Sequence, residues 1–257
     1  METVKLGKAV QTIAAIPPES TTQQCLSRTT SEIARENRQR LSAAQQEQAV
    51  AERLTRLKTQ IGPRYANCSL DNFELSADAS IRRKQESVLT KVRSYSDDIR
   101  ARTRDGVGLG LIGPVGVGKD FLQSALMLEA IRCGPRVEWR DGMALAREFR
   151  SVIDGDESEA QTISRLTGCD ILAISDPVPP SGSLSAFLKE KLFAVVDERY
   201  RNRRPTWWTL NAKDRAEAEE RLSIQVVDRL ADGALCIVCD WPSYRLSRRW
   251  TEGGQND

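Results

Sequence analysis

The chain has 257 residues, of which 40% are hydrophobic and 29% are charged. This is enough for one large α/β domain with a modest N-terminal module, and it argues against wholesale disorder. Its 38 Lys and Arg residues nearly balance its 36 Asp and Glu residues, which leaves a net charge of +2. A net charge this small does not attract the protein as a whole to nucleic acid or to an anionic membrane, so any such contact must come from a local patch of charged residues.

The chain contains no histidine, which excludes Ser/His/Asp and Cys/His nucleophiles and removes the commonest metal ligand. Catalysis would have to rely on carboxylates, Lys, Arg and a bound metal. Of the six cysteines only Cys236 and Cys239 are close in sequence, on an apolar segment that predicts a strand. Residues three apart on a strand point to opposite faces, so we expect buried, reduced thiols rather than a zinc or redox site.

The N-terminal region predicts neither a secretory signal nor a membrane span. Residues 1–18 are too short and too polar for a signal sequence, and no run approaches the roughly 20 apolar residues of a transmembrane helix. We therefore expect a cytoplasmic protein.

Residues 1–30 are rich in Thr, Ser, Gln and Pro and predict a flexible tail. Residues 31–59 contain strong helix formers with a thin apolar stripe, and the Gly62-Pro63 pair is a typical helix stop. Two interpretations of this helix stay open: a solvated helix resting on the main domain, or a helix that binds a partner.

The rest of the chain alternates between strand and helix patterns. The predicted strands are residues 107–112, 136–140, 171–174, 206–210 and 235–238. The predicted helices are residues 121–133, 143–153, 184–200 and 216–230, with an acidic loop at 154–159. Five strands alternating with helices indicate a mainly parallel sheet wrapped by helices.

A phosphate-binding loop gives the strongest signal. The sequence G-x-x-x-x-G-K follows a predicted strand and opens a predicted helix, the context that a P-loop requires. Its glycines let successive backbone N–H groups converge on phosphate oxygens, while the helix end and the lysine supply positive charge. The alternative is a turn that needs glycine for packing only. The predicted nucleotide-binding residues are Gly113, Pro114, Val115, Gly116, Val117, Gly118, Lys119 and Asp120.

Asp120 departs from the P-loop pattern, which normally has Ser or Thr here to help hold Mg²⁺. A carboxylate is also a Mg²⁺ ligand, but it places a negative charge beside a triphosphate. At about 5 Å and an effective dielectric near 20, each like-charge pair costs about 3 kcal/mol before a metal offsets it. We therefore expect nucleotide binding that is weaker or more steeply Mg²⁺-dependent.

Residues 171–176 have the form of a Walker B strand, four apolar residues followed by Ser175 and Asp176. Working ATPases of this type usually have two acids here, one for the metal's water shell and one for the attacking water. Asp176 is the only acid, so we predict Mg²⁺ ligands at Asp120 and Asp176 and consider hydrolysis doubtful. The alternative is that Asp176 is merely the polar end of a strand.

With these residues in view, residues 63–247 resemble the DnaC/IstB group of AAA+ ATPases, which contains replicative helicase loaders and transposition helper proteins. The resemblance extends through several ordered segments: 63–73, 192–206, 209–211, 220–230 and 243–245. It implies an AAA+ core, with a five-stranded parallel sheet in the order 5-1-4-3-2 between helices and a helical N-terminal extension.

The same resemblance assigns roles to single residues. Asn211 would sense the γ-phosphate, and Arg229 would act as an arginine finger on a neighbouring subunit's nucleotide, so that activity requires assembly. The alternative for Arg229 is a surface arginine on an amphipathic helix. Arg245 is a weaker candidate for a phosphate sensor. The predicted catalytic residues are Asp176, Asn211 and Arg229.

The resemblance implies ATP and Mg²⁺ as cofactors and the binding or loading of a replicative helicase as the function. A nucleotide-dependent adaptor that does not hydrolyse ATP and a transposase helper remain alternatives. The predicted organisation is a flexible tail and partner-binding region at 1–62, the ATP-binding domain at 63–250 and a disordered end at 251–257. We also expect a homo-oligomer in the nucleotide-bound state.

The family also binds single-stranded DNA, so single-stranded DNA is a further partner that the resemblance suggests. Arg147, Phe149 and Arg150 offer stacking and charge on the helix that follows the second strand. A solvated helix face is the alternative.

Overall fold

The computed structural model describes residues 30–153, 158–178 and 182–245. The chain divides into two compact units that meet in sequence between Glu47 and Gln48. Helix α1 (Thr30–Ile61) runs through this boundary, and its second half belongs to the larger unit, where Leu57 and Ile61 are buried in the core. The predicted tail (except Thr30) and the predicted disordered end at 251–257 lie outside the described residues.

A five-stranded parallel sheet forms the centre of the larger unit. The strands are β1 (Leu109–Ile112), β2 (Val137–Asp141), β3 (Ile171–Ser175), β4 (Thr206–Leu210) and β5 (Leu235–Val238). Their order is β2-β3-β4-β1-β5, which confirms the predicted order 5-1-4-3-2. In the register, Ser175 pairs with Thr209 and Ile112 pairs with Leu210, so the carboxyl ends of β1, β3 and β4 meet at one edge.

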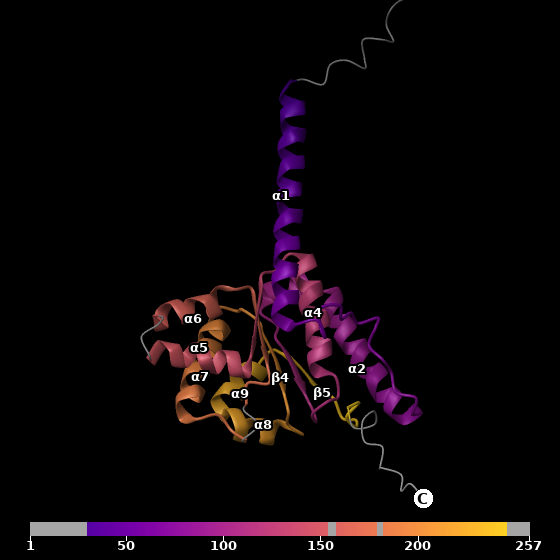
Figure 1. The fold of residues 1–257 in the computed structure, drawn as a ribbon, viewed down its shortest axis with the longest axis vertical. Helices are drawn as coiled ribbons and strands as arrows, with labels where there is room; N and C mark the ends of the chain where they lie inside the picture. The colour runs from indigo at the N-terminus through magenta and orange to yellow at the C-terminus, as the bar shows by residue number, and fades with distance from the viewer. Residues whose placement is uncertain (1–29, 154–157, 179–181, 246–257) are drawn as a thin grey trace, which may run out of the picture. The chain divides into compact units, whose positions relative to one another are not determined.

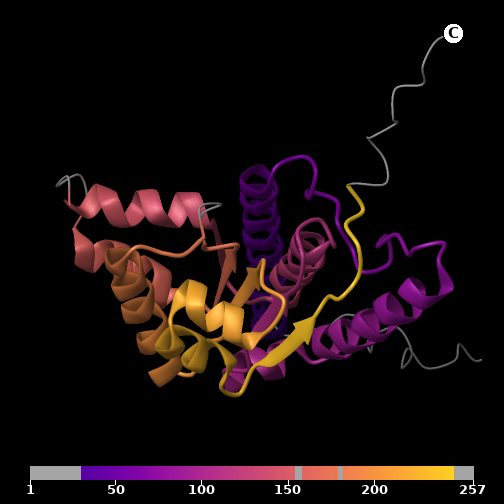
Figure 2. The same ribbon diagram turned by 90° about the horizontal axis from the view of Figure 1, so that it is seen from below.

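Helices cover both faces of this sheet (Figures 1 and 2). Helices α2 (Ala79–Asp97), α3 (Ile99–Asp105) and α4 (Lys119–Cys133) pack with the second half of α1 on one face. Helices α5 (Gly142–Ile153), α6 (Glu159–Gly168), α7 (Ala186–Arg201), α8 (Arg215–Leu222) and α9 (Ile224–Ala231) lie on the other. Because strand side chains alternate between faces, β4 contributes Trp207 to the first core and Trp208 to the second.

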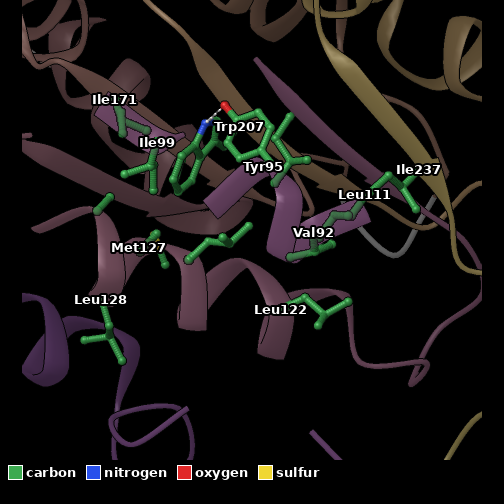
Figure 3. Close-up of a cluster of buried hydrophobic side chains, with 14 of the residues drawn as sticks. Val92, Tyr95, Ile99, Leu111, Leu122, Met127, Leu128, Ile171, Trp207 and Ile237 are labelled. Atoms are coloured by element: carbon green, nitrogen blue, oxygen red, sulfur yellow. Dashed lines mark hydrogen bonds between the residues drawn. The ribbon is translucent and has the colours of Figure 1, made fainter. Parts of the chain in front are cut away.

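Figure 3 shows a polar link within the core beneath α4. Trp207 donates a hydrogen bond from Nε1 to the Tyr95 hydroxyl at 2.9 Å, and the two rings meet edge to face with centroids 5.8 Å apart. The Tyr95 hydroxyl in turn donates to the carbonyl of Val107, just before β1. Both buried polar groups are therefore satisfied, and α2 is fixed against the strand that leads into the phosphate loop.

The helix predicted at 216–230 is two helices. Ser223 separates α8 from α9 with φ = 135°, and its hydroxyl accepts a hydrogen bond from the Val226 N–H at 3.3 Å. A serine that caps a new helix can interrupt an otherwise continuous helical pattern. Helices α2, α3 and α6 were not predicted. The predicted acidic loop lies mostly outside the described residues, and α6 begins at its last residue, Glu159.

Among the helices that the structure describes, none combines the length and the apolar character needed to cross a bilayer.

Candidate nucleotide-binding site

The phosphate loop follows the carboxyl end of β1 and is enclosed by segments distant in sequence. Gly116 and Gly118 have φ values of 82° and 97°, in the left-handed region that glycine tolerates. A Cβ on Gly116 would lie 2.0 Å from the Ser243 hydroxyl oxygen, and one on Gly118 would lie 2.9 Å from a ring carbon of Phe73. Both glycines are therefore required by backbone conformation and by close approach.

Lys119 is the first residue of α4, and its side chain is almost fully buried. Its Nζ donates hydrogen bonds to the carbonyls of Gly113 at 2.8 Å and Pro114 at 2.7 Å, and to Oδ1 of Asn211 at 2.9 Å. Burial lowers the pKa of Lys119, and the nearby carboxylates of Asp120 and Asp176 oppose that shift. The ammonium group is thus held at the loop by carbonyl and amide oxygens.

Asn211 connects this lysine to the end of β3, because its Nδ2 donates a hydrogen bond to Asp176. Asp176 has φ = 45°, an uncommon conformation for a residue with a side chain. Burial raises the pKa of Asp176, and the charge of Asp120 raises it further. Four residues predicted from the sequence, Lys119, Asp120, Asp176 and Asn211, therefore line one cavity.

The two carboxylates suit a cation that arrives with a nucleotide. Asp120 and Asp176 both line the cavity, and no group of three or more potential ligand side chains occurs among the described residues. Mg²⁺ in nucleotide sites is usually held by one or two carboxylates together with phosphate oxygens and water, rather than by a complete protein cage. The donor set thus fits Mg²⁺ bound through a nucleotide.

The hydroxyl of Ser175, at the position where a second acid is usual, is already occupied. It donates a hydrogen bond to Oε1 of Gln123 at 2.6 Å and accepts one from Nε1 of Trp139 at 2.8 Å. Both Ser175 and Gln123 are buried. A neutral hydrogen-bond network therefore occupies the position where ATPases of this type usually have an acid.

The cavity has a volume of about 300 Å³ and an aromatic wall that was not predicted. Phe73 meets Phe121 and Tyr244 edge to face, with ring centroids 5.6 Å and 6.2 Å apart, and Tyr65 also lines the cavity. Flat aromatic surfaces beside a phosphate loop are suited to contact with a purine ring. Tyr65 and Phe73 lie in residues 63–73, for which the sequence indicated a resemblance to the DnaC/IstB group but no role in the site.

The end of the described chain closes over the same loop. The Tyr244 N–H donates a hydrogen bond to the Gly116 carbonyl at 3.1 Å, and Nε1 of Trp241 donates to the Val117 carbonyl at 3.0 Å. Arg245 lines the cavity, and its charge acts against the protonated form of Lys119. Arg245, named above as a candidate for a phosphate sensor, thus lies at the nucleotide-binding cavity.

Comparison with known proteins places this geometry in a family. A profile of the IstB-like ATP binding protein family matches residues 23–251. The chain belongs to this family. No individual curated protein matches it.

Solved structures share the fold of this IstB-like protein. The DnaC helicase loader has 24% sequence identity and a TM-score of 0.59, over 69% of this chain and 99% of that one. DnaI has 20% identity and a TM-score of 0.52, over 69% of this chain and 90% of that one. AMPPCP-bound DnaA from Aquifex aeolicus has 17% identity and a TM-score of 0.53, over 69% of this chain but only half of that one.

Arg229 lies away from the cavity of its own chain. Its guanidinium pairs with Asp197 at 3.1 Å and stacks 4.9 Å from the centre of the Tyr200 ring. It lines a separate pocket of about 230 Å³ with Gly108 and Thr206, at the amino ends of β1 and β4. The phosphate loop follows the opposite end of β1, so a role for Arg229 in trans stays a prediction.

Two expectations about surface chemistry were wrong. Phe149 is 3% exposed and packs in the core beneath α5, because it lies on the apolar face of that amphipathic helix, so it offers no stacking platform for single-stranded DNA. Cys236 is exposed rather than buried, because β5 is an edge strand and this residue faces outward. Cys239 is buried, and burial raises the pKa of its thiol to about 12.

Proposed function

We propose that this IstB-like protein binds ATP with Mg²⁺ in the cavity at the phosphate loop and uses that binding to act on a replicative helicase in DNA replication, in the cytoplasm. The observation that carries the proposal is the connection of Lys119, through Asn211, to Asp176 at one edge of the sheet. It joins the phosphate loop to the ends of β3 and β4, where the resemblance implies an acid for the metal or the attacking water (Asp176) and a sensor of the γ-phosphate (Asn211).

Each residue has a definite task in this proposal. Lys119 exchanges its carbonyl partners for phosphate oxygens, and the loop N–H groups bind the remaining phosphate charge. Asn211, released by that movement, contacts the outer phosphate. Asp120 and Asp176 would hold the Mg²⁺, which would supply charge neutralisation for the triphosphate.

A second candidate, an adaptor that binds ATP without hydrolysing it, is supported by the Ser175 network. The Ser175 hydroxyl is engaged by Gln123 and Trp139, so Asp176 is the only carboxylate at the end of β3 for both metal binding and water positioning. Single-turnover measurement with radiolabelled ATP, in the presence of DNA and helicase, distinguishes the two candidates. Detectable cleavage would exclude the adaptor.

We assign partner binding to the N-terminal region, within the proposed division into 1–62, 63–250 and 251–257. Because Val50, Leu54, Leu57 and Ile61 pack against the main core, the test should remove only residues 1–47. The full chain should retain a hexameric helicase on a column, and the shortened chain should lose it while still binding nucleotide. Retention of a transposase instead would favour the transposase helper, and retention of neither by the full chain would contradict the proposal.

Assembly and DNA binding complete the proposal. We propose that Arg229 contacts the nucleotide of a neighbouring copy, which makes the nucleotide-bound form a homo-oligomer. Light scattering should show a larger mass with a non-hydrolysable ATP analogue, and Arg229→Ala should reduce that increase or the ATPase rate. An increase that is unchanged, together with an unchanged rate, would contradict the role. Single-stranded DNA remains a proposed partner, without the contribution from Phe149.

A further inference from the structure

One buried hydroxyl links the two acidic residues at the cavity, through the carboxylate of Asp120 and the backbone N–H of Asp176. Thr209 lies in β4 and is fully buried. Its Oγ1 donates a hydrogen bond to Oδ1 of Asp120 at 2.9 Å. The same oxygen accepts a hydrogen bond from the Asp176 N–H at 3.1 Å. A single side chain therefore links the first turn of α4 to the residue that follows β3.

The hydrogen-bond pattern gives this hydroxyl a fixed direction. The Asp176 N–H also donates to the Thr209 carbonyl at 3.1 Å, so this N–H would keep a partner if the hydroxyl were removed. The hydroxyl proton is committed to the carboxylate of Asp120, since that oxygen is its acceptor. This hydrogen bond uses Oδ1 of Asp120, and Asp120 lines the cavity.

The neighbouring polar side chains are engaged elsewhere and do not orient the Asp120 carboxylate. Ser175, which pairs with Thr209 in the register of β3 and β4, is turned toward Gln123 and Trp139. Asn211 is turned toward Lys119 and Asp176. Among the hydrogen bonds that the described residues make, the Thr209 hydroxyl is the contact that orients Asp120.

We propose that Thr209 is a positioning residue for the divalent cation, because its hydroxyl aims the Asp120 carboxylate at the cation so that Asp120 replaces the serine or threonine hydroxyl of an ordinary P-loop. This inference rests on the proposed function, since the cation arrives with the nucleotide. Outer groups that orient metal ligands commonly change metal affinity about 10–100-fold when they are removed.

Titration of the full chain with a fluorescent ATP analogue, in EDTA and at increasing Mg²⁺, tests the inference. Thr209→Val removes the hydroxyl at nearly constant volume and should leave the affinity in EDTA within about twofold. It should reduce the gain in affinity from Mg²⁺ by about tenfold. Thr209→Ser keeps the hydroxyl and should behave as the parent. If Thr209→Val does not fold, Thr209→Ala replaces it as the variant that lacks the hydroxyl.

Two controls separate positioning from general damage to the strand. Thr206→Val removes another buried hydroxyl from β4, one that contacts Arg199, and should leave the Mg²⁺ dependence unchanged. In an Asp120→Asn background, Thr209→Val should cause no further loss of Mg²⁺ dependence, because the hydroxyl acts through Asp120.

The outcomes are distinguishable. The inference is overturned if Thr209→Val keeps the parent's Mg²⁺ dependence, if it weakens binding equally in EDTA and in Mg²⁺, or if the serine variant fails like the valine variant. A parent chain that binds the analogue without any effect of Mg²⁺ also overturns it and leaves ATP binding intact. A parent chain that binds no nucleotide under any condition removes the proposed function itself, and the inference with it.

Discussion

Replacing Asp120 by serine restores the usual P-loop hydroxyl and removes a negative charge from the triphosphate site. Asp120 lines the cavity and is partly exposed. At a separation of about 5 Å, one carboxylate–phosphate pair costs about 3 kcal/mol at an effective dielectric of 20 and about 0.8 kcal/mol in water. Because Asp120 is only partly buried, we expect a value between these limits, about 1–2 kcal/mol.

The expected result is an increase in affinity without metal. Since each 1.4 kcal/mol is tenfold, Asp120→Ser should bind ATP about 5–30-fold more tightly in EDTA than the parent does. In Mg²⁺ the difference should shrink, because the parent's carboxylate then holds the cation. Isothermal titration calorimetry with a non-hydrolysable analogue, at fixed ionic strength with and without Mg²⁺, measures both quantities.

Asp120→Asn is the matched control, because it keeps the size of the side chain and an oxygen acceptor for Thr209 while it removes the charge. It should reproduce the gain in EDTA. Equal affinity of the parent and both variants in EDTA would refute the electrostatic reasoning, and weaker binding of both would show that the carboxylate supports nucleotide binding directly.

Three further predictions concern the loop and the fold. Gly116→Ala should abolish nucleotide binding and destabilise the fold by about 1–3 kcal/mol, measured by urea unfolding, because its Cβ would collide with Ser243 at a left-handed φ. Arg199→Met should lower the free energy of unfolding by about 3–5 kcal/mol, because this fully buried guanidinium binds several backbone carbonyls that would be left unpaired. Hydrogen bonds from Ser80 and Ile81 hold the pKa of Asp78 below its usual value. The stability that ionised Asp78 gives α2 should therefore be fully present at a pH above the usual pKa, and it should be lost as the pH falls through the lowered pKa of the folded state.

Each of these predictions has a control in the same chain. Gly62 has a similar φ of 77° with open space around it, so Gly62→Ala should show the conformational strain alone and retain nucleotide binding. Arg201 is largely exposed, so Arg201→Met should change stability by no more than about 0.5 kcal/mol. Asp78→Asn should cap α2 without the acid dependence. Loss of nucleotide binding in Gly62→Ala as in Gly116→Ala would contradict the reasoning for the loop. Equal losses of stability in Arg199→Met and Arg201→Met would contradict the reasoning for the buried guanidinium. An Asp78→Asn variant whose stability depends on acid as the parent's does would contradict the reasoning for the cap of α2.

The sheet and the phosphate loop were predictable because their signals are local. An apolar run buried on both faces, such as residues 171–174, has few alternatives to a central parallel strand. A glycine loop with Lys119 between a strand and a helix specifies its own geometry. The strand order came from the resemblance, since periodicity alone does not determine which strands are neighbours.

Helix α2 was missed although its signal is local, since Val88, Leu89, Val92 and Tyr95 recur at helical spacing on one buried face. Other features that were not predicted depend on contacts between distant residues, such as the hydrogen bond that joins Tyr95 to Trp207 across more than a hundred positions of sequence. Likewise nothing near Thr209 in the sequence indicates that its hydroxyl meets Asp120, because that contact exists only once β4 lies beside the start of α4. The break at Ser223 is local, but a serine in a helical pattern is compatible both with one continuous helix and with two helices that it separates.

The central claim is that Lys119 and the loop around it bind a nucleoside triphosphate. Equilibrium titration of a fluorescent ATP analogue into the full chain, with and without Mg²⁺, tests it most directly when it is repeated with Lys119→Ala. We predict saturable binding that Mg²⁺ strengthens and that the alanine variant loses while it remains folded by circular dichroism. Binding that survives in Lys119→Ala, or a folded parent chain that binds no analogue in either condition, would contradict the account.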